Sequence, residues 1–182
     1  MHTTWAGPEP RQMAFRHPMV LFVSRDAGIR RAAEDRMAYE LPGATQSYAV
    51  VPEDVLQDKD KVKQMMRDAG YDGVVVMKVV AVQEGFSDGY RTYGLNFVAI
   101  PGELRRDNDL WGYWDTSWGR VYNPGSYYDT QRITVDSGVY SVSDGQLLWS
   151  GQSETLNPTS LKSLLNSVVH KSIKEARKQG LS

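Results

Sequence analysis

The apolar positions in the first half of the chain alternate between strand-like and helix-like periods. A continuous apolar run, MVLFVS at 19–24, predicts a strand buried on both faces. Segment 27–41 then repeats an apolar residue every fourth position, which predicts a helix with one buried face. The charged residues of this segment fall mostly on the opposite side: Arg30, Arg31, Glu34 and Asp35. We expect Ser24 or Asp26 to cap the start of the helix.

A second strand–helix pair and a third strand follow. Segment 44–51 predicts a strand, and the apolar spacing over 53–69 predicts a helix with Gly70 at its C-terminal end. The valine-rich segment 71–83 is the most strand-like part of the chain, and we expect it in the centre of a sheet. The order strand, helix, strand, helix, strand predicts parallel βαβ units with right-handed crossovers.

Regular patterning returns after residue 128 with a predicted hairpin. Asp144-Gly145 is a strong signal for a two-residue turn. A turn centred there pairs Val142 with Leu147 and Tyr140 with Trp149, and it places all four side chains on one face. Alternation slips at 136–138, where we expect a bulge or bend.

The last predicted element is a helix that runs to Gly180, with Asn157 as N-cap and Pro158 at its first position. Its final turns are basic, which suits the negative end of a helix dipole. The predicted fold is therefore a single α/β (α+β) domain over 19–182, preceded by an extended leader at 1–18. Its mixed sheet has the order β-α-β-α-β, an irregular aromatic insertion at about 84–128, and then β-β-α.

Composition narrows the function classes. The chain of 182 residues has 21 basic and 22 acidic residues, a net charge of −1 and no basic run, so no nucleic-acid partner is expected. The absence of cysteine excludes thiol nucleophiles, thiolate metal sites and disulfides. The sequence contains no run of 18 apolar residues, so no transmembrane segment is predicted.

No motif assigns a catalytic residue, a metal site or a cofactor. The histidines are His2, His17 and His170, and we interpret them as surface residues because metal and triad sites need convergent partners. Phosphate loops and nucleophile elbows are absent from the sequence.

Acidic residues of the insertion offer two alternatives. Asp107, Asp109 and Asp115 loosely resemble a calcium loop, but the required glycine and the final glutamate are missing. Paired acids of a hydrolase could be drawn from this set: Glu84, Asp88, Glu103, Asp107 and Asp109. Solvated loop charges are the simpler interpretation.

The insertion is unusually aromatic. It holds 11 of the 19 aromatic residues, and DLWGYWDTSWG at 109–119 holds three of the five tryptophans. A disordered loop would be poor in such residues. The rings could form a satellite core, a surface for a protein partner or a stacking platform for cell-wall glycan. The candidate binding residues are Trp111, Tyr113, Trp114, Trp118 and Tyr122, and the three tryptophans would form one stripe on a helix.

Several blocks of the chain resemble a bacterial family of lipoproteins of unknown function. The blocks are RRAAEDRMAYEL, AGYDGVVVMKVV, YYDT and VYSVSDGQLLWSGQSETLNPTS, which together span about residues 19–180. The resemblance implies a fold similar to the α/β periplasmic domains of curli-secretion lipoproteins and of lipoprotein activators of cell-wall synthases. It implies no catalytic residue, because none is established for that family.

Members of that family carry a signal peptide and a lipid-bearing cysteine just before a segment such as TTWAGPEP. This chain has no cysteine, so either these features belong to the native precursor or the protein departs from the pattern. The resemblance implies a location in the periplasm or cell envelope, with outer-membrane anchoring through a lipid on the precursor.

We therefore predict a non-catalytic envelope module that binds another envelope protein, through 86–128 or through an exposed sheet edge. A glycan-binding module and a carboxylate-dependent hydrolase stay open as alternatives.

Overall fold

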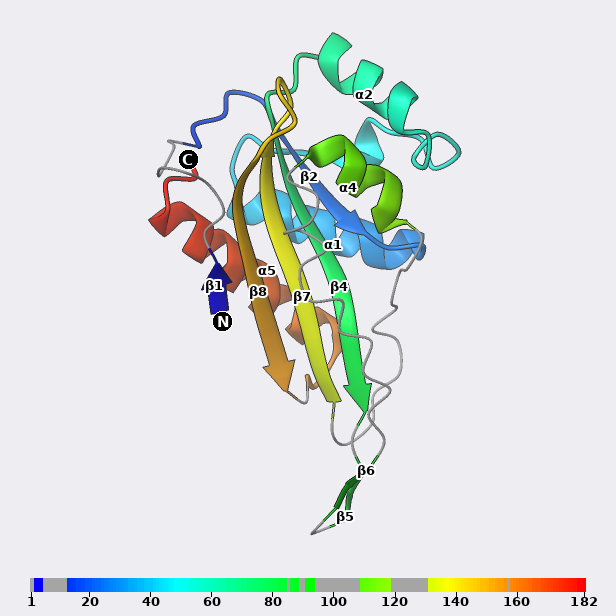
Figure 1. The fold of residues 1–182 in the computed structure, drawn as a ribbon, viewed down its shortest axis with the longest axis vertical. Helices are drawn as coiled ribbons and strands as arrows, with labels where there is room; N and C mark the ends of the chain where they lie inside the picture. The colour runs from blue at the N-terminus through cyan, green and yellow to red at the C-terminus, as the bar shows by residue number, and fades with distance from the viewer. Residues whose placement is uncertain are drawn as a thin grey trace.

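A mixed β-sheet with helices on both faces forms the body of the protein (Figure 1). The computed structural model describes residues 2–4, 13–84, 86–88, 91–93, 109–118, 131–156 and 158–182. Across the six-stranded sheet the order is β1 (His2–Thr4), β8 (Leu147–Leu156), β7 (Gln131–Ser141), β4 (Gly73–Glu84), β2 (Pro18–Val23) and β3 (Thr45–Gln46). Strand β2 runs parallel to β3 and β4, and the remaining neighbours are antiparallel. The predicted mixed sheet with packed helices is confirmed.

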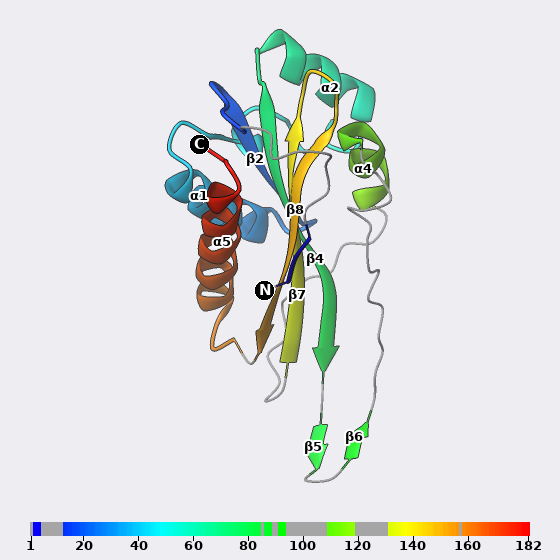
Figure 2. The ribbon, with the colours of Figure 1, turned by 60° about the vertical axis from the view of Figure 1, so that its left-hand side comes forward.

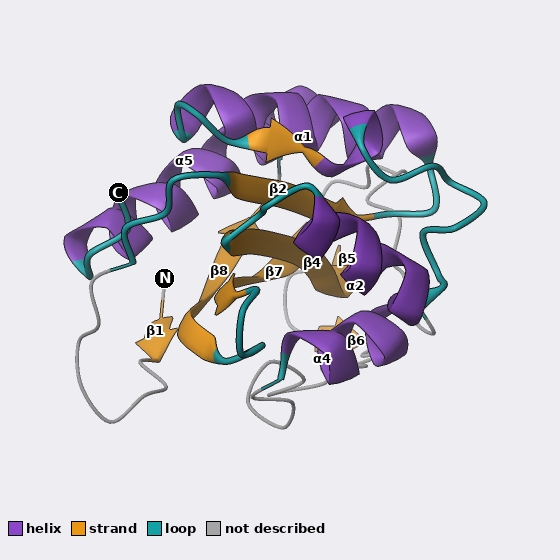
Figure 3. Cartoon of the chain, turned by 90° about the horizontal axis from the view of Figure 1, so that it is seen from above, coloured by secondary structure: helices purple, strands orange, loops and turns teal. Residues whose placement is uncertain are grey.

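Helices cover the two faces of the sheet unequally (Figures 2 and 3). One face carries α1 (Ala27–Glu40) and α5 (Leu161–Lys178), which lie side by side. The other face carries α2 (Lys59–Asp68) and α4 (Leu110–Ser117), both near one end of the strands. A separate antiparallel ladder joins β5 (Phe86–Asp88) to β6 (Arg91–Tyr93).

Each face of the sheet has its own apolar core. Alternate residues of β2 divide between them: Val20 and Phe22 face α1 and α5, whereas Met19, Leu21 and Val23 face the other side. The run that predicted a doubly buried strand thus contributes to both cores. The α5-side core also takes in Met13, whose backbone N–H donates to the carbonyl of Gly180 at 3.1 Å.

Two helix ends have the capping residues that the sequence predicts. Asp26 caps α1 by accepting from the Ile29 N–H at 2.9 Å, as one of the two predicted caps. Gly70 adopts a φ of 75°, the conformation expected of a glycine after a helix. Helix α5 begins later than predicted, with Ser160 as its N-cap; Asn157 lies outside the described residues.

Two predicted elements are shorter in the structure. The strand predicted over 44–51 is limited to Thr45–Gln46, and a 3₁₀ turn, η1 (Ser47–Ala49), follows it. Helix α2 begins at Lys59, because the segment before it forms turns in which the Leu56 carbonyl accepts from a tryptophan indole. A carbonyl inside a helix would be occupied by the backbone N–H four residues on.

The hairpin register differs from the prediction. Tyr140 pairs with Leu147 and Val139 pairs with Trp149, with a register shift between the two pairs. The extra residue on β8 reverses the facing of the side chains that follow it. Trp149 therefore packs on the α5 side, while Tyr140 and Leu147 pack on the α4 side. The predicted turn glycine, Gly145, has a φ of 74°.

Candidate functional site

The aromatic segment that the sequence singled out is the helix α4. Asp109 caps it by accepting from the Gly112 N–H at 2.9 Å. Trp111 and Trp114 form the buried stripe of this helix together with Leu110 and Tyr113, and Trp118 follows as its buried C-cap residue. The Asp109 N-cap and the apolar residues that recur with the helical period explain why this part of the insertion is helical.

The four described candidate rings are buried. Trp111, Tyr113, Trp114 and Trp118 have exposed fractions of 6%, 2%, 1% and 5%. The Trp114 indole N–H donates to the carbonyl of Leu56 at 2.8 Å, and Tyr113 stacks on Tyr140 with ring centroids 5.8 Å apart. Packed in this way, the rings form the satellite core that was one of the three interpretations. The fifth candidate, Tyr122, lies outside the described residues.

The acidic candidates do not converge in the described part of the chain. Asp109 is a helix cap, and Asp115 lies at the surface, 3.8 Å from the Lys59 ammonium. The side chains of Glu84 and Asp88, and residues Glu103 and Asp107, lie outside the description. Within the described residues, no group of three or more His, Asp or Glu side chains could hold a metal ion.

The histidines have ordinary neighbours. His17 stacks on Tyr71 with ring centroids 4.2 Å apart. His170 on α5 places its Nδ1 atom 3.2 Å from a carboxylate oxygen of Glu40 on α1. His2 belongs to β1, of which only the backbone is described.

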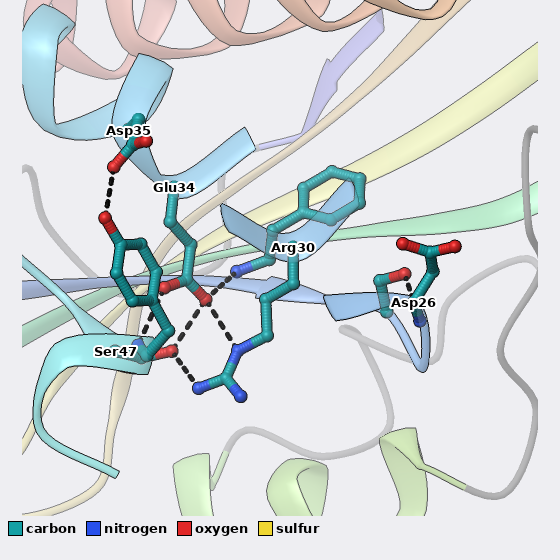
Figure 4. Close-up of polar contacts among 8 residues, drawn as sticks. Asp26, Arg30, Glu34, Asp35 and Ser47 are labelled. Atoms are coloured by element: carbon teal, nitrogen blue, oxygen red, sulfur yellow. Dashed lines mark hydrogen bonds and ion pairs between the residues drawn. The ribbon is translucent and has the colours of Figure 1, made fainter. Parts of the chain in front are cut away.

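A buried ionic cluster, which the sequence analysis did not find, lies between α1 and the edge of the sheet (Figure 4). Arg30 and Glu34 were expected among the outward-facing charges of the helix, and that expectation is wrong: they are 1% and 0% exposed. Their side chains pair at 3.1 Å between Nε and Oε1. Ser47 of η1 joins them by donating to Glu34 at 2.6 Å and accepting from Arg30 at 2.8 Å. A charged pair at i and i+4 beside the predicted apolar stripe was the only sequence signal.

The Glu34 carboxylate also binds the backbone of two elements. It accepts from the Phe22 N–H of β2 at 3.1 Å and from the Tyr48 N–H of η1 at 3.0 Å. Burial raises the pKa of Glu34 above its ordinary value, against the hydrogen bond from Ser47 and the charge of Arg30, which both lower it. The cluster explains why the predicted strand at 44–51 stops early, because the Ser47 hydroxyl and the Tyr48 N–H of η1 both donate to this carboxylate.

This cluster closes one edge of the sheet. Strand β3 pairs with β2 only at Met19 and Val20. Further along β2, the Phe22 N–H that would face a neighbouring strand is bound by Glu34 instead. An edge whose donors are covered by a side chain is a poor template for another strand.

The opposite edge is built differently. Strand β8 has ten residues, and β1 pairs with it only at Ser150, Gly151 and Gln152. In the described part of the chain, no strand pairs with the outer side of β8 beyond those positions. Glu154 is exposed there, and Gln152 is half-buried and donates to Asp136 of β7 at 2.8 Å. The distal half of β8 is thus a sheet edge with a polar border.

Comparisons with known proteins show no family for this chain. No family model matches it, and no curated protein matches it. The chain is similar to the PelC dodecamer from Paraburkholderia phytofirmans, with 12% identity, coverage of 93% of this chain and 92% of that chain, and a TM-score of 0.47. It is also similar to lipoprotein GNA1162 from Neisseria meningitidis, with 13% identity, coverage of 89% and 96%, and a TM-score of 0.41.

A third likeness is to the hypothetical protein CT253 from Chlamydia trachomatis, with 7% identity, coverage of 91% and 95%, and a TM-score of 0.43. At TM-scores below 0.5, none of these likenesses assigns a function. Over the residues that the structure describes, the chain is an α+β domain whose sheet is covered by the Glu34 cluster at one edge and paired with β1 at three positions of the other. Among the helices that the structure describes, none has both the length and the apolar character needed to cross a membrane.

Proposed function

We propose that this chain is a non-catalytic binding and assembly module of the bacterial cell envelope, and that it engages a partner protein through the outer edge of β8. The observation that carries the proposal is the contrast between the two sheet edges. Glu34 binds the edge donor of β2 at Phe22, whereas β8 is paired by the described strands over three of its ten residues on its outer side. A partner strand added to β8 beyond its pairing with β1 would gain main-chain hydrogen bonds there.

The chemistry of β8 supports a regulated contact rather than indiscriminate aggregation. Strand β8 reads LLWSGQSETL, so apart from Leu156 its apolar residues lie near the hairpin turn and its distal half is polar. Charged and polar side chains are the usual means by which proteins limit edge-to-edge association. A partner would therefore need polar groups that complement Glu154 and Thr155, and this requirement would restrict which strands pair there.

The envelope location in this proposal comes from the sequence resemblance to bacterial lipoproteins. The edge contact itself needs no lipid anchor, so the two parts can be tested separately. Fractionation of the native bacterium tests the location. Recovery of the protein from the cytoplasm alone would remove the envelope from the proposal and leave the edge contact untouched.

The edge contact is tested by lysine substitutions on β8. Glu154→Lys with Thr155→Lys places two long cations on the part of β8 beyond its pairing with β1, a substitution type that blocks strand pairing at natural edges. The matched control carries Asp68→Lys on α2 and Thr116→Lys on α4, the same change of charge at exposed positions away from that edge. Circular dichroism verifies that both variants fold.

The readout is co-isolation of partners from envelope extracts with the tagged chain. We expect the parent and the control variant to retain a discrete set of envelope proteins that the β8 variant loses. A β8 variant that retains the same set as the parent would contradict the proposal.

The glycan alternative predicts a different result. A platform needs rings open to a flat ligand, and the four described rings are at most 6% exposed. We therefore expect the purified protein to stay in the supernatant when it is centrifuged with insoluble peptidoglycan. Pelleting of the parent, lost in a folded triple Trp111→Ala, Trp114→Ala, Trp118→Ala variant, would restore the glycan platform.

A further inference from the structure

The outer layer formed by α1 and α5 carries a second surface, independent of the β8 edge (Figure 2). We propose that this surface docks on an anionic membrane, with its basic side chains bound to lipid phosphate groups. The surface consists of the exposed side of α5 together with Arg36 and Tyr39 of α1.

Charge is strongly one-sided on α5. Five basic residues are exposed on this helix, namely Lys162, Lys171, Lys174, Arg177 and Lys178. Glu175 is the one acidic residue of the helix, and its carboxylate lies 2.6 Å from the Lys178 ammonium. The whole chain has a net charge of −1, so this basic face is a local concentration that the overall charge conceals. Clusters of four to eight basic residues on a helix are typical of surfaces that bind anionic lipids.

A groove at the start of α5 adds hydrogen-bond donors to this charge. The groove has a volume of about 600 Å³, and its lining includes Arg36, Lys162, Ser163, Ser167, His170 and Lys171. None of the described residues that line it is acidic. Ammonium, guanidinium and hydroxyl groups at one place suit a phosphate group, which accepts several charge-assisted hydrogen bonds.

The helix dipole does not account for this distribution. Basic residues in the last turn of a helix are explained by the negative end of the dipole, and Arg177 and Lys178 lie there. Lys162 is the second residue of α5, where the dipole disfavours a positive charge. Its position beside the groove suits a ligand of negative charge instead.

The neighbouring carboxylates leave this surface basic. Glu40 of α1 contacts both Arg36 and His170, and the guanidinium of Arg177 donates to the Glu40 carbonyl at 2.5 Å. Glu40 and Glu175 together offset two of the six lysine and arginine charges of the surface. Lys162, Lys171 and Lys174 form no ion pair with either carboxylate, and their side chains are exposed.

The extended shape and one aromatic ring favour a membrane over a free phosphate. Helix α5 has 18 residues and is about 27 Å long, so its basic stripe spans several lipid headgroups. Tyr39 is 75% exposed, the one large apolar side chain so exposed among the described residues. Its ring centre lies 5.0 Å from the Arg36 guanidinium carbon. Tyrosine is enriched at the level of lipid headgroups.

The test is sedimentation with vesicles. The probe is phosphatidylcholine vesicles containing 30% phosphatidylglycerol, compared with pure phosphatidylcholine, at low and at physiological salt. We expect the parent to bind only the anionic vesicles, and to bind less as salt rises. In a Lys162→Gln, Lys171→Gln, Lys174→Gln variant, binding should fall about 100-fold, because each basic residue near such a surface contributes about fivefold.

A control with the same loss of charge carries Lys59→Gln, Lys61→Gln and Arg67→Gln on α2, on the opposite face of the sheet. We expect it to lose less than about threefold. Tyr39→Ser should weaken binding to anionic vesicles without changing its dependence on salt. Equal losses of vesicle binding in the α5 variant and the α2 control would overturn the proposal. The absence of binding of the parent to anionic vesicles at low salt would also overturn it. Suppression of vesicle binding by millimolar inorganic phosphate at constant ionic strength would also overturn it, since a free phosphate would then be the ligand.

Discussion

Truncation of Glu34 to alanine tests whether the buried cluster closes the β2 edge. The substitution removes the acceptor of three buried donors: the Phe22 N–H, the Arg30 Nε–H and the Ser47 hydroxyl. Each buried donor left without a partner costs about 1–3 kcal/mol. Because water can enter the space and serve some of them, we expect the free energy of unfolding to fall by about 3–5 kcal/mol. Removal of one partner from a buried ion pair costs a similar amount.

The conservative variant separates hydrogen bonding from charge. In Glu34→Gln the amide oxygen can still accept from the three buried donors, and only the bond from the Tyr48 N–H is lost. We expect this variant to lose about 1 kcal/mol, the usual net contribution of one hydrogen bond. Urea unfolding at pH 7, followed by tryptophan fluorescence and circular dichroism, measures both values.

Two outcomes would refute this reasoning. A Glu34→Ala variant that loses less than about 1 kcal/mol would mean that the carboxylate does not serve the edge. Equal losses in the alanine and glutamine variants would mean that the charge of Glu34, rather than its acceptor oxygens, stabilises the cluster.

Three further predictions concern stability. Burial raises the pKa of Glu34 above its ordinary value of 4.5, so the folded state retains this proton to a higher pH than the unfolded state. The stability advantage of the parent over Glu34→Gln should therefore shrink as pH rises above about 4.5. Urea unfolding from pH 4 to 8 measures this advantage, and an advantage that grows with pH would contradict the prediction. Trp114→Phe leaves the Leu56 carbonyl without its 2.8 Å donor and removes ring volume, so we expect a loss of about 2–3 kcal/mol by urea unfolding. Gly145→Ala should cost more than Gly43→Ala in thermal unfolding: both have positive φ, but at Gly145 a Cβ would lie 2.5 Å from the carboxylate that caps α4, whereas Gly43 faces open space. Equal shifts in Tm would contradict that ranking.

The elements with strong local signals were predictable from the sequence. The apolar period over 27–41 and the Asp26 cap gave α1, and the valine-rich run gave the central strand β4. The Asp-Gly pair placed the turn of the hairpin at Gly145. In each of these cases the local preference and the packing require the same conformation.

The remainder depended on contacts between distant segments. The hairpin register was wrong because one extra residue on β8 reverses the facing of Trp149, and no local pattern marks that bulge. The strand predicted at 44–51 was too long because Ser47 and Tyr48 turn toward a carboxylate on α1. Such tertiary hydrogen bonds override strand propensity.

The candidate site also combines features that local sequence predicts with features that depend on contacts between distant segments. The tryptophan spacing within 109–118 predicts one stripe only if the segment is helical, and packing against α2 and Tyr140 decides that its rings face inward. Arg30 and Glu34 were expected on the side of the helix opposite its apolar face, since charge alone does not reveal burial. The basic final turns of α5 were visible in the sequence, but only the fold places Arg36 of α1 beside Lys162 and Lys171.

The most direct test of the β8 contact is photo-crosslinking in the native bacterium. A benzophenone amino acid replaces Glu154, which is exposed on β8, and in a parallel strain it replaces Gln64, which is exposed on α2. The proposal predicts a discrete envelope-protein adduct from position 154 and none from position 64. No adduct at 154, or the same adducts from both positions, would contradict it.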